Sequence, residues 1–322
     1  DEKRPNIIVT LGKGKKSLMM LAHMDVVPAG DGWNSDPFTL VRKDGLLYGR
    51  GVSDDKGSLL SLLMLIDYLK DKTINGKLVF VFASDEEKAG PHGLKYLLKN
   101  KLISADAAIV ADTPGELKKI MVAERGSLNL KVTAKGVAWH SAYTHLGGVN
   151  AIVKMSDLIS ELDCYVLKYE SHKYLNPPVI SVVRINSGVA NNVIPNVCEA
   201  VFNIRTIIGQ TPDKIVSELK DLAKPFGEFN FEIISSSLAT EVCDSHPIIK
   251  IIQSSAKKFN INAEPAGLNG GTDCKKLIQA GIPAVGYCFP IEGIAHKANE
   301  CVEEEYLFKY AIILGEVVTE YF

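Results

Sequence analysis

Short apolar segments alternate with segments of helical periodicity in the first third of the chain, and few folds accommodate such a pattern. The run from Ser17 to Ala22 is almost wholly apolar, as is typical of a parallel strand buried on both faces. We expect strands at 6–11, 17–22, 77–83 and 107–111, with helices at 57–69 and 92–100. This order predicts an α/β domain built on a mostly parallel sheet.

The pattern changes near Glu124. The expected elements are then a strand at 127–134, a helix at 149–162, strands at 179–186 and 197–206, a helix after Thr211-Pro212 and a strand at 229–234. The order β-α-β-β-α-β is that of a ferredoxin-like unit. The three serines at 235–237 are interpreted as a linker, and helix and strand alternate again from His246.

The length of 322 residues favours two domains. We therefore predict a discontinuous catalytic domain at 1–124 and 236–322, with a smaller ferredoxin-like domain inserted at 125–235.

Composition excludes several classes of protein. A net charge of -2 offers no electrostatic reason to bind nucleic acid or an anionic membrane. The longest apolar run, 59–66, is far shorter than the ~20 residues that span a bilayer. The charged start Asp-Glu-Lys-Arg-Pro has no apolar core of a signal peptide, and the six scattered cysteines contain no C-x-x-C pair. We expect a cytoplasmic protein with reduced thiols.

Acidic and histidine side chains stand at or just beyond several predicted strand ends. The motifs are His23-Met24-Asp25, Asp85-Glu86-Glu87 and Asp112, joined by Asp54-Asp55 before a helix and by His296 beyond the apolar segment 284–287. Ligands of open α/β sheets bind outside the carboxyl ends of the strands, where such loops converge. Two histidines and several carboxylates in one crevice predict a site for zinc or a similar divalent ion.

Each motif alone has a plainer explanation. The His-x-Asp motif is compatible with a capped turn, and Asp-Glu-Glu with a solvated acidic face. Asp54-Asp55 suits a helix N-terminus, Asp112 a turn and His296 a buried core position. We expect all five motifs to occupy the corresponding position, just after a strand of one sheet, and this joint arrangement favours the metal site.

Longer motifs carry a resemblance to a known family. They are Leu-Ala-His-Met-Asp-Val-Val-Pro, Tyr-Gly-Arg-Gly-Val-Ser-Asp-Asp-Lys-Gly, Ser-Asp-Glu-Glu, Asn-Asn-Val-Ile-Pro-Asn, Asn-Gly-Gly-Thr-Asp and Ala-His-Lys-Ala-Asn-Glu, in this order. The chain resembles the zinc metallopeptidase family of acetylornithine deacetylase, succinyl-diaminopimelate desuccinylase, aminoacylase, glutamate carboxypeptidase and several dipeptidases.

The resemblance implies two bound zinc ions, with cobalt or manganese as alternatives. His23 would bind one ion and His296 the other, Asp54 would bridge them, and Glu87 and Asp112 would complete the sites. It also implies a cis peptide bond between Asp54 and Asp55.

Two further residues receive catalytic roles by the same resemblance. Asp25 would hydrogen-bond the imidazole of His23 and fix its tautomer. Glu86 would be the general base that takes a proton from the attacking water and passes it to the leaving amine.

The resemblance extends to the inserted domain, which becomes a dimerisation or lid domain. His140 would reach across a homodimer to stabilise the oxyanion in the partner's site, and Arg205 would clamp a substrate carboxylate. A polar turn residue and a strand residue paired with an acid are the respective alternatives. Other expected substrate contacts are Tyr143, Asn192, Gly271 and Thr272.

Three features depart from the family pattern. Asp112 stands where the deacylases usually have glutamate and the peptidases aspartate. Asp55 replaces a usually apolar residue, and the chain begins closer to its first histidine than relatives do, as a shorter or trimmed version would.

The favoured function is hydrolysis of the amide bond of N-acyl amino acids by a two-zinc enzyme. A dipeptidase or carboxypeptidase with the same machinery is the alternative, and a metal-free binding protein is a more remote one. The expected partners are a small substrate and a second copy of the chain.

Overall fold

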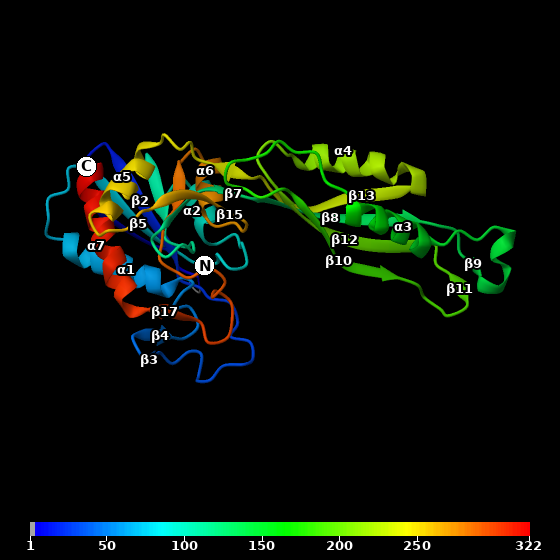
Figure 1. The fold of residues 1–322 in the computed structure, drawn as a ribbon, viewed down its shortest axis with the longest axis horizontal. Coiled ribbons are helices and arrows are strands. Elements are labelled where there is room, and N and C mark those ends of the chain that lie inside the picture. The colour runs from blue at the N-terminus through cyan, green and yellow to red at the C-terminus, as the bar shows by residue number, and fades with distance from the viewer. Residues whose placement is uncertain (1–3) are drawn as a thin grey trace. The chain divides into compact units, whose positions relative to one another are not determined.

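The computed structural model describes residues 4–322, so Asp1–Lys3 of the charged N-terminal segment lie outside the described residues. The chain forms two compact units (Figure 1). The first unit comprises the chain up to Ala123 and from Glu241 onward, and the second comprises Glu124–Thr240. Each unit is described by itself.

A mixed sheet is the centre of the first unit. Its order is β1-β5-β2-β6-β16-β7-β14, and β15 also pairs with β7. The strands are β1 (Ile7–Leu11), β2 (Ser17–His23), β5 (Lys77–Ala83), β6 (Ala107–Val110), β7 (Lys119–Glu124), β14 (Thr240–Glu241), β15 (Glu264–Leu268) and β16 (Ala284–Gly286). β5, β2, β6 and β16 are mutually parallel, whereas β1 and β7 pair antiparallel to their neighbours. The expected mostly parallel sheet is therefore corrected to a mixed one with a parallel centre.

Both faces of the parallel centre are buried. Every residue of β2 is buried, because helices cover the strand on each side. Met19, Val79 and Leu277 share a core cluster with α2, while α1 packs against β2 and against α7. The helices of this unit are α1 (Lys56–Leu69), α2 (Leu94–Lys99), α5 (Pro247–Lys257), α6 (Cys274–Gln279) and α7 (Glu304–Tyr321).

A small three-stranded sheet stands apart from the main one. Its order is β17-β4-β3, formed by β3 (Val41–Lys43), β4 (Leu46–Tyr48) and β17 (Cys301–Glu303). β4 and β17 pair antiparallel, with Tyr48 opposite Cys301. The segment that follows β4 therefore starts beside the end of the segment that precedes β17.

The second unit has the expected β-α-β-β-α-β order. Its antiparallel sheet, β10-β12-β8-β13, has a core formed with two helices. The elements are β8 (Gly126–Lys135), α3 (Ala151–Cys164), β10 (Val179–Ser187), β12 (Val197–Thr206), α4 (Pro212–Ala223) and β13 (Phe229–Ser237). The short 3-10 turn η2 (Lys224–Phe226) lies between α4 and β13 in the chain. Several apolar residues of the outer strands β10 and β13, such as Val183, Ile185 and Ile234, are exposed.

The linker expected at 235–237 was wrong. Ser235, Ser236 and Ser237 extend β13 and pair with Asn129, Leu128 and Ser127 of β8. Cross-strand hydrogen bonding overrides the turn preference of serine here, and the second unit accordingly runs on to Thr240.

A small excursion interrupts the second unit between β8 and α3. It consists of β9 (Trp139–His140) and the 3-10 turn η1 (Ser141–Leu146), with β9 paired to β11 (Val193–Ile194). Within residues 4–322, no helix combines the length and apolar character needed to cross a membrane.

Candidate metal centre

The four parallel strands bring most of the predicted ligands to one edge of the sheet. His23 is the last residue of β2, Glu86 and Glu87 follow β5, and Asp112 follows β6. The segment after β16 carries His296. Because parallel strands end at the same edge, these residues converge there.

Asp54 reaches the same place by another route. It follows β4 of the small sheet and directly precedes Asp55, the N-cap residue of α1. The expectation that all five motifs follow strands of one sheet was therefore wrong for Asp54. A helix start and a second sheet supply this residue instead.

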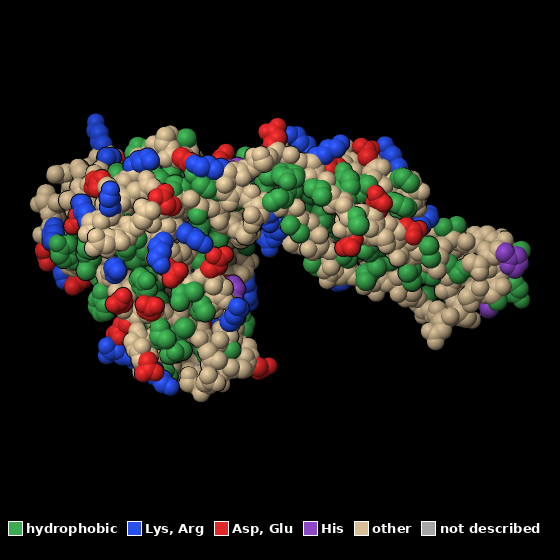
Figure 2. All heavy atoms as spheres, viewed as in Figure 1, with side chains coloured by type: hydrophobic (Ala, Val, Ile, Leu, Met, Phe, Trp, Pro, Cys, Tyr) green, Lys and Arg blue, Asp and Glu red, His purple; other side chains and the backbone are tan. Residues whose placement is uncertain are grey.

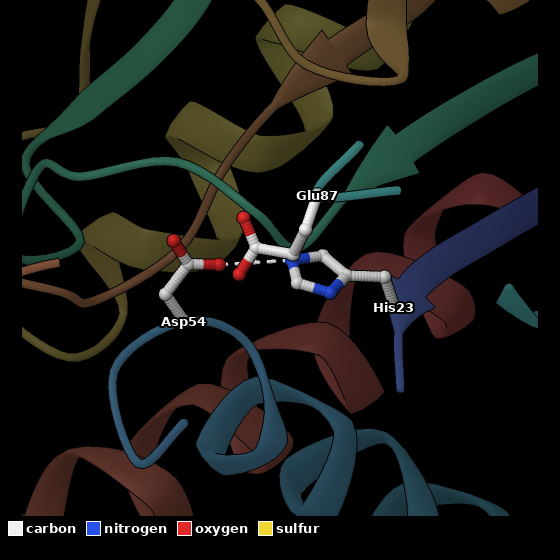
Figure 3. Close-up of side chains that lie close together, drawn as sticks. All are labelled: His23, Asp54 and Glu87. Atoms are coloured by element: carbon white, nitrogen blue, oxygen red, sulfur yellow. Dashed lines mark hydrogen bonds and ion pairs between the residues drawn. The ribbon is translucent and has the colours of Figure 1, made fainter. Parts of the chain in front are cut away.

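The carboxylate of Asp54 lies between two histidines. Its Oδ1 is 2.8 Å from Nε2 of His23, and its Oδ2 is 3.0 Å from Nε2 of His296. Figure 3 shows the side chains of His23, Asp54 and Glu87 pointing toward one another. The two oxygens of one carboxylate thus face two different imidazoles.

Two further carboxylates each lie beside one of these two histidines. Oδ1 of Asp112 is 4.0 Å from Nε2 of His23, and Oε2 of Glu87 is 3.0 Å from Nε2 of His296. Ligand atoms bound to one tetrahedral zinc ion lie about 3.4 Å apart. The donor types and spacings therefore fit two ions that share Asp54.

Glu86 lies close to His23 and Asp112. Ligand atoms of His23, Glu86 and Asp112 lie within 4.8 Å of one another, as do those of His23, Asp54 and Glu87. The side chain that the sequence predicts to be the base consequently borders the same space as the predicted ligands.

The charges of the site favour a bound cation. Burial raises the pKa of Asp112 well above its usual range and, with the nearby Asp54, also raises that of Glu87. The pKa of His23 is raised as well: burial opposes this shift, but the acidic side chains of Asp25 and Asp54 beside the ring outweigh the effect of burial. A divalent ion would offset the repulsion among these crowded carboxylates.

The imidazole of His23 is oriented by the backbone of Asp25. Nδ1 is 2.9 Å from the carbonyl oxygen of Asp25 and 3.6 Å from its carboxylate. An Nδ1–H that donates to this carbonyl leaves the lone pair of Nε2 facing Asp54, the tautomer that a metal ligand requires.

The carboxylate of Asp25 also binds the loop that carries Glu86 and Glu87. It accepts hydrogen bonds from the backbone amides of Glu86 and Glu87, each at 3.1 Å. Burial acts to raise the pKa of Asp25, but the nearby imidazole of His23 and the hydrogen bonds from these amides lower it to about 2. Asp25 therefore orients the loop of the predicted base more directly than it orients the imidazole.

Glu86 has a pKa close to neutrality. Burial, reinforced by the nearby charge of Asp273, raises the pKa of Glu86 to about 7. Asp273 is buried and forms an ion pair with Lys276. Sequence reasoning did not single out these two residues, although Asp273 ends the Asn-Gly-Gly-Thr-Asp motif that could have indicated it.

The peptide bond between Asp54 and Asp55 is cis, which confirms the expectation. Asp55 is buried, and its Oδ2 accepts a hydrogen bond from the backbone amide of His23 at 3.0 Å. The sequence offered no explanation for an acidic residue here, whereas the structure shows that it ties the start of α1 to the end of β2.

A pocket of about 270 Å³ opens onto these residues within the first unit. Its lining includes Asp54, Glu86 and His296 together with Gly271 and Thr272. The structure therefore brings two of the predicted substrate contacts beside the predicted ligands.

The other predicted contacts lie in the second unit. His140 of β9 pairs with Val193, and the amide of Ser141 donates to the carbonyl of Asn192 at 3.0 Å. The rings of His140 and Tyr143 are 5.5 Å apart. Figure 2 shows exposed histidines at the end of this unit where β9 and β11 lie.

Arg205 lies elsewhere in the second unit. It is on β12, opposite Ser127 of β8 and Val179 of β10, and is partly exposed. The structure thus groups His140, Tyr143 and Asn192 but places Arg205 on the four-stranded sheet of the second unit.

Comparisons with known proteins cover nearly the whole chain. Residues 19–320 match peptidase family M20/M25/M40. An uncharacterized metallohydrolase of Methanocaldococcus jannaschii is 30% identical over 354 aligned residues, covering 98% of this chain and 84% of the relative. A succinyl-diaminopimelate desuccinylase of Ehrlichia canis is 28% identical, with 98% and 85% covered.

The fold is also similar to that of solved structures. Aminopeptidase PepT from Bacillus cereus superposes with a TM-score of 0.82 at 23% identity, covering 98% of this chain and 84% of that protein.

Proposed function

Because the chain belongs to peptidase family M20/M25/M40 and is a metal-dependent amide hydrolase, we propose that it uses two metal ions to release the acyl group of N-acyl amino acids. The observation that carries the two-ion proposal is Asp54, whose two carboxylate oxygens face two different histidines at 2.8 and 3.0 Å. A carboxylate in this position suits a ligand shared by two ions.

His23, Asp54 and Asp112 would hold one ion, and Asp54, Glu87 and His296 the other. Imidazole and carboxylate donors suit zinc, with cobalt and manganese as the alternatives. When bound, the ions would lower the pKa of water and polarise the substrate carbonyl.

Glu86 is the proposed general base. Its carboxyl borders the ligand set, and its pKa of about 7 allows it both to accept and to release a proton near neutral pH. Glu86 takes a proton from the attacking water and passes it to the nitrogen of the leaving amine. Asp25 holds the backbone of Glu86 during this transfer.

The second unit would supply the remaining substrate contacts. Arg205 suits a substrate carboxylate, since its guanidinium can bind one through two hydrogen bonds. His140 would donate to the oxyanion in the partner site of a homodimer, with Tyr143 and Asn192 beside it. The homodimer and the cytoplasmic location stay predictions.

A dipeptidase or carboxypeptidase is the second candidate. Asp112 favours it, because aspartate at this position is more typical of the peptidase members of the family. Deacylation is preferred because the desuccinylase relative is similar across 98% of the chain.

A hydrolysis panel distinguishes the candidates. Protein loaded with zinc or cobalt is assayed with N-acetylornithine, N-succinyl-diaminopimelate and other N-acyl amino acids, and with simple dipeptides. We expect the N-acyl amino acids to be cleaved faster and the Glu86→Gln variant to be strongly impaired on both kinds of substrate. Faster cleavage of dipeptides would favour the second candidate. A protein that binds no metal would instead favour a binding protein.

A further inference from the structure

A buried ion pair lies directly behind two of the proposed metal ligands. Nη1 of Arg50 is 2.6 Å from Oε2 of Glu300, and the side chains are only 1% and 0% exposed. Arg50 follows β4 and Glu300 precedes β17, so the pair joins the two loops that continue from the small sheet.

The carboxylate of Glu300 organises the loop that leads to Asp54. Oε1 accepts hydrogen bonds from the amides of Ser53 at 2.8 Å and Asp54 at 3.0 Å. Oε2 also accepts from the amide of Gly51 at 3.2 Å. The loop thus wraps around one carboxylate, which fixes the direction in which its backbone presents Asp54.

Arg50 extends the same connection to two other loops. Its Nη2 donates to the carbonyl oxygens of Ala29 at 3.0 Å and of His296 at 3.4 Å. Its guanidinium also lies 5.1 Å from the centre of the Trp33 ring. A planar group with several donors can hold these partners at once, which a lysine cannot.

We propose that Arg50 and Glu300 are positioning residues that set the separation of Asp54 and His296 and thereby the affinity for the second metal ion. This inference rests on the proposed two-ion site. Glu300 holds the backbone of Asp54, Arg50 holds the backbone of His296, and the ion pair links the two.

The ion on the other side of Asp54 depends on this pair less, because Asp54 is the one ligand of its proposed three that the pair holds, whereas the pair holds both Asp54 and His296 of the second ion. His23 ends β2 and is held by Asp25 and Asp55, and Asp112 directly follows β6. Loss of the ion pair should therefore weaken binding at Glu87 and His296 while leaving the site of His23 and Asp112 occupied.

The test is a calorimetric titration of the metal-free chain of 322 residues with Zn²⁺. The Glu300→Gln variant keeps the size of the side chain and one carbonyl acceptor but loses the charge that pairs with Arg50. We expect the second ion to bind about 10- to 100-fold more weakly, as when groups that orient metal ligands are removed, and the first ion, which shares only Asp54 with it, to be weakened by a clearly smaller factor.

A second variant keeps the test decisive if Glu300→Gln does not fold. Arg50→Lys preserves the charge but cannot reach both Glu300 and the carbonyl of His296, so it should also weaken the second ion selectively. The matched control is Arg42→Gln, which breaks an exposed ion pair with Glu304 and should change neither binding step.

Thermal melting of each metal-free variant separates positioning from general support of the fold. Equal weakening of both ions in proportion to a lower melting temperature would overturn the inference, as would two unchanged steps in either folded variant. A wild-type protein that binds fewer than two ions would instead overturn the proposed function.

Discussion

The two units of the molecule carry their polar groups in different ways. In the first unit, His23, Asp55 and Glu300 are almost fully buried, and each has hydrogen-bond partners in another segment. In the second unit, His140 and Tyr143 are exposed on a short excursion, and His140 caps its own turn. The first unit is built around its site, whereas these groups of the second unit face outward.

The architecture explains the difference. Parallel strands covered on both faces leave only their ends for polar side chains, so several buried loops meet at one edge. An antiparallel sheet with helices on one face needs no such edge. The buried residues of its hydrophobic core come mainly from β8, β12, α3 and α4, and Ile180 of β10 and Phe231 of β13 pack against them. Preorganised chemistry is therefore expected in the first unit, and contacts completed by another molecule in the second.

The largest expected effect tests the buried site of the first unit. Replacing Glu86 with glutamine removes the proposed base without changing the size of the side chain, so kcat should fall about 10²- to 10⁴-fold. Steady-state kinetics on an N-acyl amino acid measure the loss, and metal titration should still find two ions. Glu116→Gln, on an exposed turn, is the control. A Glu86→Gln enzyme with full activity would contradict the assignment.

The next effect tests the exposed part. His140→Ala should lower kcat about 10²- to 10³-fold, the usual loss when one oxyanion donor is removed. The control is His145→Ala, in the same exposed turn. If His140 acts in the partner site, mixing His140→Ala with Glu86→Ala subunits restores part of the activity. A confirmed mixed dimer without restored activity would exclude action across the interface.

A smaller effect is expected at Asp25. Alanine at this position removes the acceptor of the Glu86 and Glu87 amides, so metal affinity and activity should fall about 10- to 100-fold. Competition with a chelator measures the affinity. Asp36→Ala removes a carboxylate with two similar local hydrogen bonds on an exposed turn, and it should have no effect on metal. Equal losses in both variants would count against a specific role of Asp25.

The smallest effect concerns pH. Glu86 accepts a proton only as a carboxylate, so kcat/KM should fall by up to tenfold per pH unit below its pKa of about 7. Asp273→Asn removes a charge that raises this pKa, and the acidic limb of the profile should shift to lower pH. Rates between about pH 5 and pH 9 measure both curves. A wild-type limb centred near the ordinary pKa of glutamate would be inconsistent with the buried base.

Local pattern was enough to predict most strands and helices. The apolar run at Ser17 and the Thr211-Pro212 helix start correspond to β2 and α4, in which the Thr211 side chain accepts from the amide of Lys214. Pairing partners were harder to predict, because they depend on segments distant in sequence. The serines at 235–237 show this, since only their pairing with β8 makes them a strand.

The sequence by itself determined which residue types are available for the site and that most of them follow strands. The local hydrophobic pattern indicates where strands end. This pattern was sufficient to identify His23, Glu86, Glu87 and Asp112. Only the tertiary structure decided that Asp54 lies between two histidines, that Asp55 and Asp25 hold neighbouring backbones, and that Arg50 and Glu300 join two loops. These contacts link residues up to 250 positions apart, and no local pattern encodes such a distance.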